Sequence, residues 1–477
     1  MAAVDTDLLR ELAGAENVRD SETDLYVYGI DASVHSARPM AVVKPDAPEQ
    51  VQKILEYAQS AKIPIIPRGS GSAMCGQTIP INGGIVLDMK GMNRILEINI
   101  RDGYCRVEPG VVDEDLNIAL KGYGFFYPPA PASSRVATIG GEIGNNASGV
   151  RSVKYGAARD YILGLNVVLP GGNELKLGSR TRVVSSGYQL ERLFAGSEGT
   201  LGVITEAILK FIPLPKFRCL GISNFEKLEQ AGEAVADVIS SGSNPSMLEL
   251  IDNVAIRAVN EATGIGLPDV EAILLFEADG MVKEGVEYEI QNIEKYCEKN
   301  NGFGIESSYE QSERSRLFAG RKQLFPSLAK YRSVLSTTAL ADDMAVPFSK
   351  MAETTRKIHT VAEKHNVIMT AYGHCGSGCV HTKILMDTSK KEVWEAAKQV
   401  VAEIYEYVHS VGGTTSAEHG IGISKGFAMQ QEHSQILDLM RGIKKVFDPD
   451  NICNPMKLMD APPDWLGATG LRYSVKQ

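Results

Sequence analysis

Three glycine-rich segments constrain the fold of this 477-residue chain more than any other feature. They cover residues 67–72, 138–149 and 196–202, and they separate stretches with strand-like or helix-like apolar periods. Glycine permits positive φ angles and lets backbone N–H groups come close to an anion. Loops that only turn between strands explain any one segment well, but they explain all three together poorly. We therefore expect a phosphate-bearing ligand in the first half of the chain.

Two familiar phosphate-binding motifs fail in this region. The first segment begins like a dinucleotide fingerprint with Gly69-Ser70-Gly71, but the next glycine is Gly76, which breaks the G-x-G-x-x-G spacing. Residues 71–78 have P-loop spacing, but Gln77 occupies the place of the phosphate-binding lysine. NAD on a Rossmann turn and nucleoside triphosphate hydrolysis are both disfavoured.

The order of predicted elements indicates an α+β protein with more than one domain. The first part mixes a helix at 48–58 with strands at 63–67, 84–88, 104–107 and 165–169, and a hairpin turn at 170–173 leads into 174–177. Two prolines in 211–215 mark a linker. A β-α-β-β-α-β order follows at 219–223, 225–239, 247–251, 272–277, 282–296 and 304–307. This order predicts a ferredoxin-like antiparallel sheet.

The second half carries two histidines and an acid-histidine pair in glycine-hinged segments. His374 and His381 flank glycines that disfavour a continuous helix, so we expect a loop leading into a strand at 380–385. With Glu418 they suit a divalent metal, and His419 next to that carboxylate is placed to move protons. The alternatives are satisfied polar groups in a glycine-rich turn, or a structural zinc site that also uses Cys375 and Cys379.

Composition excludes several classes of function. The net charge of −10 without a basic cluster argues against nucleic-acid binding. The acidic start of the chain and the lack of any apolar run of membrane-spanning length predict a cytoplasmic protein with no transmembrane segment. The seven cysteines are scattered, which predicts thiols, and neither an iron-sulfur run nor a haem attachment motif is present in the sequence.

Together these segments resemble the FAD-linked oxidoreductases of the vanillyl-alcohol oxidase, or p-cresol methylhydroxylase (PCMH), type. The resemblance covers nearly the whole chain and is carried by residues 67–71, 138–146, 154–161, 196–205, 373–381, 418–422 and 454–457. Within the family it is closest to the branch of D-lactate dehydrogenases, glycolate oxidase D subunits and D-2-hydroxyglutarate dehydrogenases. Cys375, Ser377 and Cys379 depart from the usual residues of that branch, which puts substrate details in doubt.

The resemblance implies three regions. They are a two-part PCMH-type FAD-binding domain at 1–215, a substrate-binding cap domain with the metal site at 216–425, and a C-terminal segment at 426–477 that packs back on the FAD domain. The FAD is expected to be non-covalent, because the first loop lacks the histidine of tethered relatives. The implied FAD-binding residues are Arg68, Gly69, Ser70, Gly71, Ser72, Gly76, Thr138, Gly140, Gly141, Asn145, Asn146, Gly149, Tyr155, Gly156, Gly199, Ile204 and Asn454.

The resemblance also implies a mechanism. His374, His381 and Glu418 would hold zinc, iron or manganese, which lowers the pKa of the substrate's hydroxyl, and His419 would remove its proton. Arg321 would bind the substrate's carboxylate, although a surface arginine is the simpler interpretation. The expected reaction is oxidation of a D-2-hydroxyacid, with D-lactate as first choice, by hydride transfer to FAD.

Reduced flavin must pass its electrons on, so a redox partner is expected. Candidates are an electron-transferring flavoprotein, as in an electron-bifurcating complex, an iron-sulfur subunit, or quinone. A glycolate or D-2-hydroxyglutarate dehydrogenase subunit is the nearest alternative function. A zinc hydrolase or a non-catalytic binding protein would use the same histidines without flavin.

Overall fold

The computed structural model describes residues 3–331, 336–340 and 342–472, and they form two compact units. Unit 1 comprises Met1–Ser148, Ala157–Leu214 and Glu418–Arg472, and the described part of unit 2 comprises Gly149–Gly156 and Pro215–Ala417. After the short excursion at Gly149–Gly156, the chain passes to unit 2 for its long segment at the proline-rich linker, between Leu214 and Pro215. The chain returns to unit 1 at Glu418, earlier than the expected start of the C-terminal region at 426.

The first layer of unit 1 is a small sheet with the strand order β1-β3-β5-β4. Three of its strands are parallel, and β1 runs antiparallel to β3. Its core is almost purely aliphatic and is covered by two helices. The elements are α1 (Thr6–Ala13), β1 (Val18–Arg19), β3 (Ala41–Val43), α3 (Pro48–Ala61), β4 (Ile65–Arg68) and β5 (Ile85–Asp88). Pro48 starts α3 in the position where a missing N–H costs nothing.

The second layer of unit 1 is an antiparallel sheet with the order β10-β9-β11-β7-β6. It contains β6 (Ile95–Asn99), β7 (Tyr104–Val107), β9 (Ile162–Val168), β10 (Glu174–Gly178) and β11 (Val203–Lys210), and α4 (Asp113–Lys121) and α5 (Ile139–Asn145) contribute to its core. The predicted hairpin between β9 and β10 is confirmed. Gly171 and Gly172 both have positive φ, as the tight turn requires.

The second glycine-rich segment is partly helical, which the sequence did not predict. Residues 139–145 form α5, with Thr138 as the N-cap and Asn146 ending the helix in the left-handed region at φ 55°. Glycine is a poor helix former. Ile139 and Ile143 lie one turn apart and are buried in the core of the second sheet, so tertiary packing overrides the local preference.

Unit 2 is built on a ferredoxin-like sheet, as predicted. The neighbours β16-β13-β15-β14 are antiparallel, and the sheet continues through β19, β20 and β17. Its strands are β13 (Phe217–Phe225), β14 (Met247–Asp252), β15 (Ala272–Gly280), β16 (Phe303–Ser308), β17 (Ser336–Thr338), β18 (Met344–Ala345), β19 (Ile368–Gly373) and β20 (Cys379–Met386). The strand expected at 380–385 is therefore confirmed.

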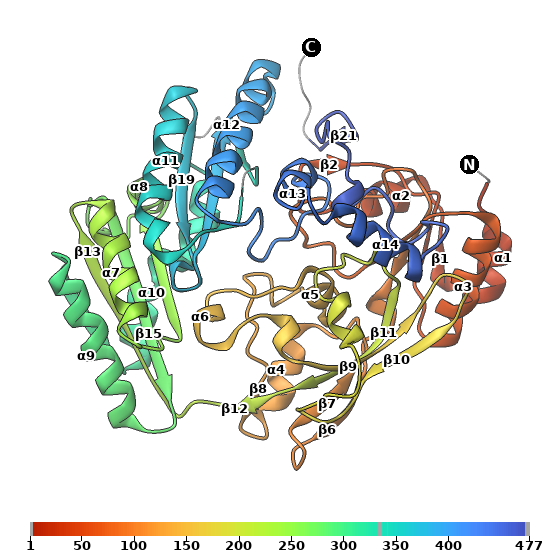
Figure 1. The fold of residues 1–477 in the computed structure, drawn as a ribbon, viewed down its shortest axis with the longest axis horizontal. Helices are drawn as coiled ribbons and strands as arrows, with labels where there is room; N and C mark the ends of the chain where they lie inside the picture. The colour runs from red at the N-terminus through yellow and green to blue at the C-terminus, as the bar shows by residue number, and fades with distance from the viewer. Residues whose placement is uncertain (1–2, 332–335, 341, 473–477) are drawn as a thin grey trace. The chain divides into compact units, whose positions relative to one another are not determined.

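Helices flank this sheet (Figure 1). Four helices contact one another in the order α9 (Lys283–Lys299), α7 (Leu228–Ser240), α11 (Met351–Lys364) and α12 (Lys391–Ser410), and α8 (Asn253–Thr263) packs against α10 (Gln311–Leu328). The short segment 149–156 belongs to unit 2 because Lys154 and Tyr155 both bond to Asp279 of β15. No helix in the described ranges has both the length and the apolar character to cross a membrane.

The C-terminal part of unit 1 contains α13 (Gly426–Glu432) and α14 (Leu437–Phe447) and then runs beside β4. Ile65 donates its N–H to Ile452 and accepts one from Asn454, so the segment pairs with the edge of the first sheet. Further on, β21 (Gly470–Leu471) pairs with β2 (His35–Ser36). The chain's end is thereby tied to its beginning within unit 1.

His35 makes this tie sensitive to acid. Its ring is fully buried, and its two nitrogens contact the hydroxyls of Thr469 and Ser424 at 2.8 and 2.9 Å. Burial, with a smaller effect from the charge of Lys457, lowers the pKa of His35 from 6.5 to about 3. Between these values the unfolded chain binds a proton that the folded chain does not.

We predict that stability is lost as pH falls from 6.5 toward 3, by about 1.4 kcal/mol per pH unit from this group. Urea unfolding midpoints at several pH values measure it. His35→Gln should flatten this part of the profile, whereas His433→Gln at the end of α13 should not. An unchanged slope in His35→Gln would contradict the assignment.

Candidate functional site

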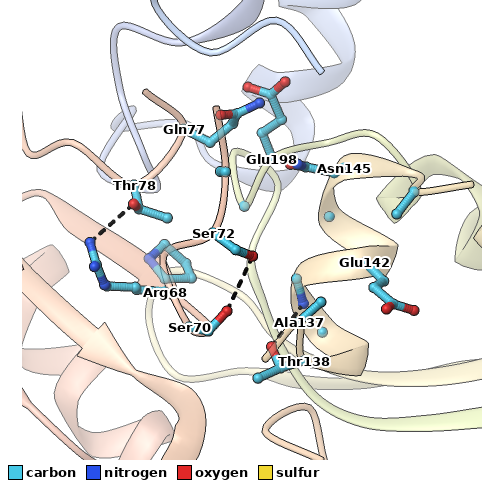
Figure 2. A pocket seen from close by; sticks show the side chains of 18 of the residues that line it. Arg68, Ser70, Ser72, Gln77, Thr78, Ala137, Thr138, Glu142, Asn145 and Glu198 are labelled. Carbon is cyan, nitrogen blue, oxygen red and sulfur yellow. Dashed lines mark hydrogen bonds between the residues drawn. The ribbon is translucent and has the colours of Figure 1, made fainter. Parts of the chain in front are cut away.

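The glycine-rich segments of unit 1 line a common pocket (Figure 2). Residues 67–74 form one side of it, residues 137–148 another, and residues 197–204 a third. Figure 2 shows Ser70 and Ser72 joined by a hydrogen bond, with Arg68 on one side of them and Asn145 on the other, and with Gln77 and Glu198 together at one rim. The predicted FAD-binding residues that line the pocket are Arg68, Gly69, Ser70, Gly71, Ser72, Thr138, Gly140, Gly141, Asn145, Gly199 and Ile204.

The glycines give this pocket the backbone geometry of an anion cradle. A Cβ at Gly69 would lie 2.3 Å from Thr138 Oγ1, so the first loop packs directly on the cap of α5. Gly71 and Gly199 have φ of 74° and 72°, which other residues rarely adopt. At Gly144 no heavy atom would lie within 4 Å of an added Cβ, so this position faces open space in the pocket. The pocket therefore fits a phosphate-bearing cofactor.

Arg68 is the cation of the first loop. Its side chain is buried, and Nη1 donates to Ile30 O at 2.9 Å and to Thr78 Oγ1 at 3.1 Å. Burial lowers the pKa of this arginine, and nearby acids including Asp31 only partly offset the effect. The guanidinium thus supports the loop and places positive charge beside the cavity.

Six of the residues expected to bind FAD lie elsewhere. Gly149, Tyr155 and Gly156 belong to unit 2. Gly76 is packed closely, since an added Cβ would lie 3.0 Å from both His35 and Ile423. Asn146 accepts the N–H of Arg159. Asn454 donates its side-chain N–H groups to the carbonyls of Gln77 and Glu198 at 2.9 and 2.6 Å. Asn454 therefore contacts the backbone of two residues that line the pocket, Gln77 and Glu198. The roles of the six toward FAD stay predictions.

Glu418 and His419 also line this pocket, although they are remote in sequence from its loops. Ser148 Oγ donates to Glu418 Oε2 at 2.8 Å, and Gln77 Nε2 donates to the carbonyl of His419 at 2.6 Å. A buried carboxylate, Glu198, accepts the N–H of Ile421 at 2.6 Å. Sequence reasoning placed Glu198 in a loop motif but gave it no role.

In unit 2, Glu249 joins two of the predicted site residues. Its side chain is fully buried in β14 and contacts His374 Nδ1 at 2.5 Å and Arg321 Nε at 2.8 Å. Burial alone would raise the pKa of Glu249, but the charges of His374 and Arg321 outweigh it and lower that pKa. Arg321 is mostly buried and also lies over the ring of Tyr372. The surface-arginine interpretation of Arg321 is therefore wrong. Glu249 was not among the residues predicted for the site, because no sequence motif indicates it.

His381 lies beside His374, with ring centroids 4.8 Å apart. Its Nδ1 is 3.8 Å from Asp343 Oδ1, and its Nε2 is 3.7 Å from Cys379 Sγ. Asp343 was missed, although the consecutive acids Asp342-Asp343 between two predicted strands were a visible signal. Imidazole and carboxylate groups crowded in a buried place fit a divalent cation.

Of the two cysteines in the structural zinc alternative, Cys379 lies beside His381, but Cys375 is occupied elsewhere. Cys375 Sγ donates a hydrogen bond to the carbonyl of Leu248 at 3.1 Å, which occupies the thiol in a backbone contact. All seven cysteines are buried thiols, as the sequence predicted.

Comparison with known proteins now decides the family. The C-terminal domain model of FAD linked oxidases matches residues 214–458, and an FAD binding domain model matches residues 39–178. The chain belongs to the FAD-linked oxidases. It is therefore an FAD-dependent oxidoreductase, and this membership gives no support to a zinc hydrolase.

Relatives cover most of the chain. The glycolate oxidase subunit GlcD of Bacillus subtilis is 36% identical, over 94% of this chain and 95% of its own. A mitochondrial D-lactate dehydrogenase [cytochrome] of Arabidopsis thaliana is 34% identical, over 89% of this chain and 74% of its own. The structure of p-cresol methylhydroxylase with substrate bound superposes with a TM-score of 0.78 at 19% identity, over 94% of this chain and 95% of that one. The last likeness confirms the PCMH-type fold.

We predict that Gly144→Leu prevents FAD binding, because its side chain would project into the pocket. Flavin absorbance per protein should fall at least about tenfold, since a filled binding cavity costs far more than 1.4 kcal/mol. Gly442→Leu is the matched control, because this exposed glycine in α14 also has open space around it. Equal flavin content in the two variants would place FAD elsewhere.

Proposed function

We propose that this protein is an FAD-dependent dehydrogenase that oxidises a D-2-hydroxyacid, with D-lactate as the first substrate to test. The observation that carries the proposal is that His419 lines the same pocket as the glycine-rich loops, so a basic side chain stands beside the place for flavin. The D-lactate dehydrogenase among the relatives supports the choice of substrate. The glycolate oxidase subunits support glycolate as the second candidate, and D-2-hydroxyglutarate remains a third from the sequence.

We further propose that His374, His381 and Glu418 bind a divalent metal such as zinc, iron or manganese. The donor set supports this, because two imidazoles and a carboxylate leave positions open for substrate oxygens. When bound, FAD accepts a hydride and the metal makes the substrate's hydroxyl more acidic. Asp343 is an additional candidate ligand on the side of His381.

The protein's own groups have three tasks in this scheme. His419 accepts the hydroxyl proton, so that a proton and a hydride leave the alcohol as it becomes a carbonyl. Arg321 binds the substrate's carboxylate through its guanidinium. Glu249 keeps His374 Nδ1 engaged, which directs Nε2 of that ring toward a metal.

The electrons must leave the flavin through another carrier. The names of the glycolate oxidase relatives describe subunits, which supports a multi-subunit redox complex. An electron-transferring flavoprotein is our first candidate, with an iron-sulfur subunit or quinone as alternatives. The cytoplasmic location expected from the sequence stays a prediction.

We predict that His419→Ala keeps FAD and metal but loses turnover by about 10²–10⁴-fold, the usual loss for a general base. His374→Ala should lose metal and turnover together. The measurements are anaerobic flavin bleaching by D-lactate, glycolate or D-2-hydroxyglutarate, and metal content by elemental analysis.

His433→Ala is the control, because this histidine lies outside the proposed site at the end of α13. Parental rates in both His419→Ala and His374→Ala would refute the site assignment. A flavin that none of the three acids bleaches would refute the proposed substrate class.

Arg321→Lys should raise KM for the 2-hydroxyacid at least about tenfold, because lysine keeps the charge but loses the planar fork. Arg316→Lys on the same helix is the matched control, since Arg316 pairs with Glu306 and Glu313 on the surface. Steady-state kinetics of both variants measures the difference. An unchanged KM in Arg321→Lys would remove this arginine from the substrate site.

A further inference from the structure

The segment that carries Glu418 and His419 is held by the loops that line the flavin pocket. We call residues 418–424 the base segment. Gln77, from the end of the first loop, donates its side-chain N–H to the carbonyl of His419 at 2.6 Å. The neighbouring Cys75 accepts the N–H groups of Ile423 and Ser424 at 2.7 and 3.2 Å through its carbonyl. The residues that directly follow the first glycine-rich loop therefore contact both ends of the base segment.

Glu198, from the third loop, holds the middle of the base segment. Its Oε1 accepts the N–H of Ile421 at 2.6 Å, and its Oε2 accepts the N–H of Gly422 at 2.9 Å. Figure 2 shows the side chains of Glu198 and Gln77 pointing in the same direction at the rim of the pocket. One carboxylate thus fixes two consecutive backbone amides.

The second loop contributes through Ser148. Its hydroxyl donates to Glu418 Oε2 at 2.8 Å. The second and third glycine-rich segments, and the residues that directly follow the first one, therefore all bond to the base segment within unit 1.

Close backbone packing leaves the base segment little room to move. An added Cβ at Gly420 would lie 2.6 Å from both Gln77 Nε2 and Glu198 Oε1, and one at Gly422 would lie 2.2 Å from Cys75 O. Both glycines also have positive φ. A shift of the cofactor loops must therefore shift the base segment.

Both the backbone conformation and the burial of Glu198 are energetically unfavourable, which a simple turn would not require. Its backbone has φ 51°, which is uncommon for a residue with a side chain, and its carboxyl group is buried. Burial raises the pKa of Glu198 to about 7, although the N–H groups of Ile421 and Gly422 lower it. Strained and desolvated groups of this kind persist where the surroundings impose them, and they cluster at functional sites.

We propose that Glu198 and Gln77 are positioning residues that transmit the arrangement of the flavin-binding loops to His419. Neither is assigned to touch substrate. The inference rests on the proposed role of His419 as base. It predicts that weakening these contacts slows the substrate's reaction with flavin while leaving flavin bound and chemically reducible.

Glu198→Gln is the sharpest test, because the amide keeps the shape but has only one acceptor oxygen for two N–H groups. Hydrogen exchange of a peptide covering residues 418–424 in the FAD-loaded protein should become about tenfold faster, which is the effect of one lost hydrogen bond to a charged group. Flavin bleaching by the 2-hydroxyacid should slow by at least about tenfold with KM little changed. Reduction by dithionite and the flavin content should stay at wild-type values.

Glu206→Gln is the matched control, because it makes the same chemical change at a carboxylate of β11 that accepts a hydrogen bond from Arg106 Nε at 2.7 Å. It should match wild type in every measurement. If Glu198→Gln does not fold, Gln77→Met provides the same test, since it removes the donor to His419 and keeps the bulk of the side chain.

Exchange and bleaching rates in Glu198→Gln that equal those of Glu206→Gln would overturn the proposal. Loss of flavin from Glu198→Gln would also overturn it, because the residue would then serve cofactor binding. A wild-type flavin that none of the 2-hydroxyacids bleaches would refute the proposed function, while the exchange comparison would still decide the coupling.

Discussion

The carboxylate of Glu198 is the contact on which the candidate site of unit 1 depends. It is buried at the rim of the pocket and accepts two backbone N–H groups from a segment more than two hundred residues away in sequence. A buried carboxylate without partners would be very costly, so the partners and the carboxylate fix one another. Lys457 adds a buried positive charge to this environment, and burial lowers the pKa of that lysine to about 8.

Unit 2 uses a second buried acid in a similar way. Glu249 lies in a sheet strand and is shared by His374 and Arg321. A rigid strand places the acid, and the acid in turn restricts a histidine and an arginine that come from other elements. Both units therefore orient their functional groups through buried carboxylates, whose desolvation is offset by charged or backbone donors. Glu198 lies in a glycine-rich motif and Glu249 in none, so the motifs alone did not indicate either contact.

Much of the architecture could be predicted from local patterns. The alternation of strands and helices after residue 216 specifies the ferredoxin-like order, because each element has a clear apolar period and the turns lie between them. The hairpin at 170–173 follows from two adjacent glycines. The helix at 139–145 could not be predicted in this way, because its glycines oppose a helix and only the burial of Ile139 and Ile143 stabilises it. Asn146 ends that helix and accepts the N–H of Arg159, and its role toward the cofactor, assigned from its place in a motif, stays a prediction.

The sequence by itself determined the family, the glycine-rich loops and the chemical types of residue available for catalysis, because these depend on short motifs with fixed spacing. Only the tertiary structure decided which side chains hold these motifs in place. Glu249 bonds to a histidine 125 positions later, and Gln77 bonds to His419 across 342 positions. Such contacts depend on how strands and loops pack around a buried charge, and no local pattern of residues records them.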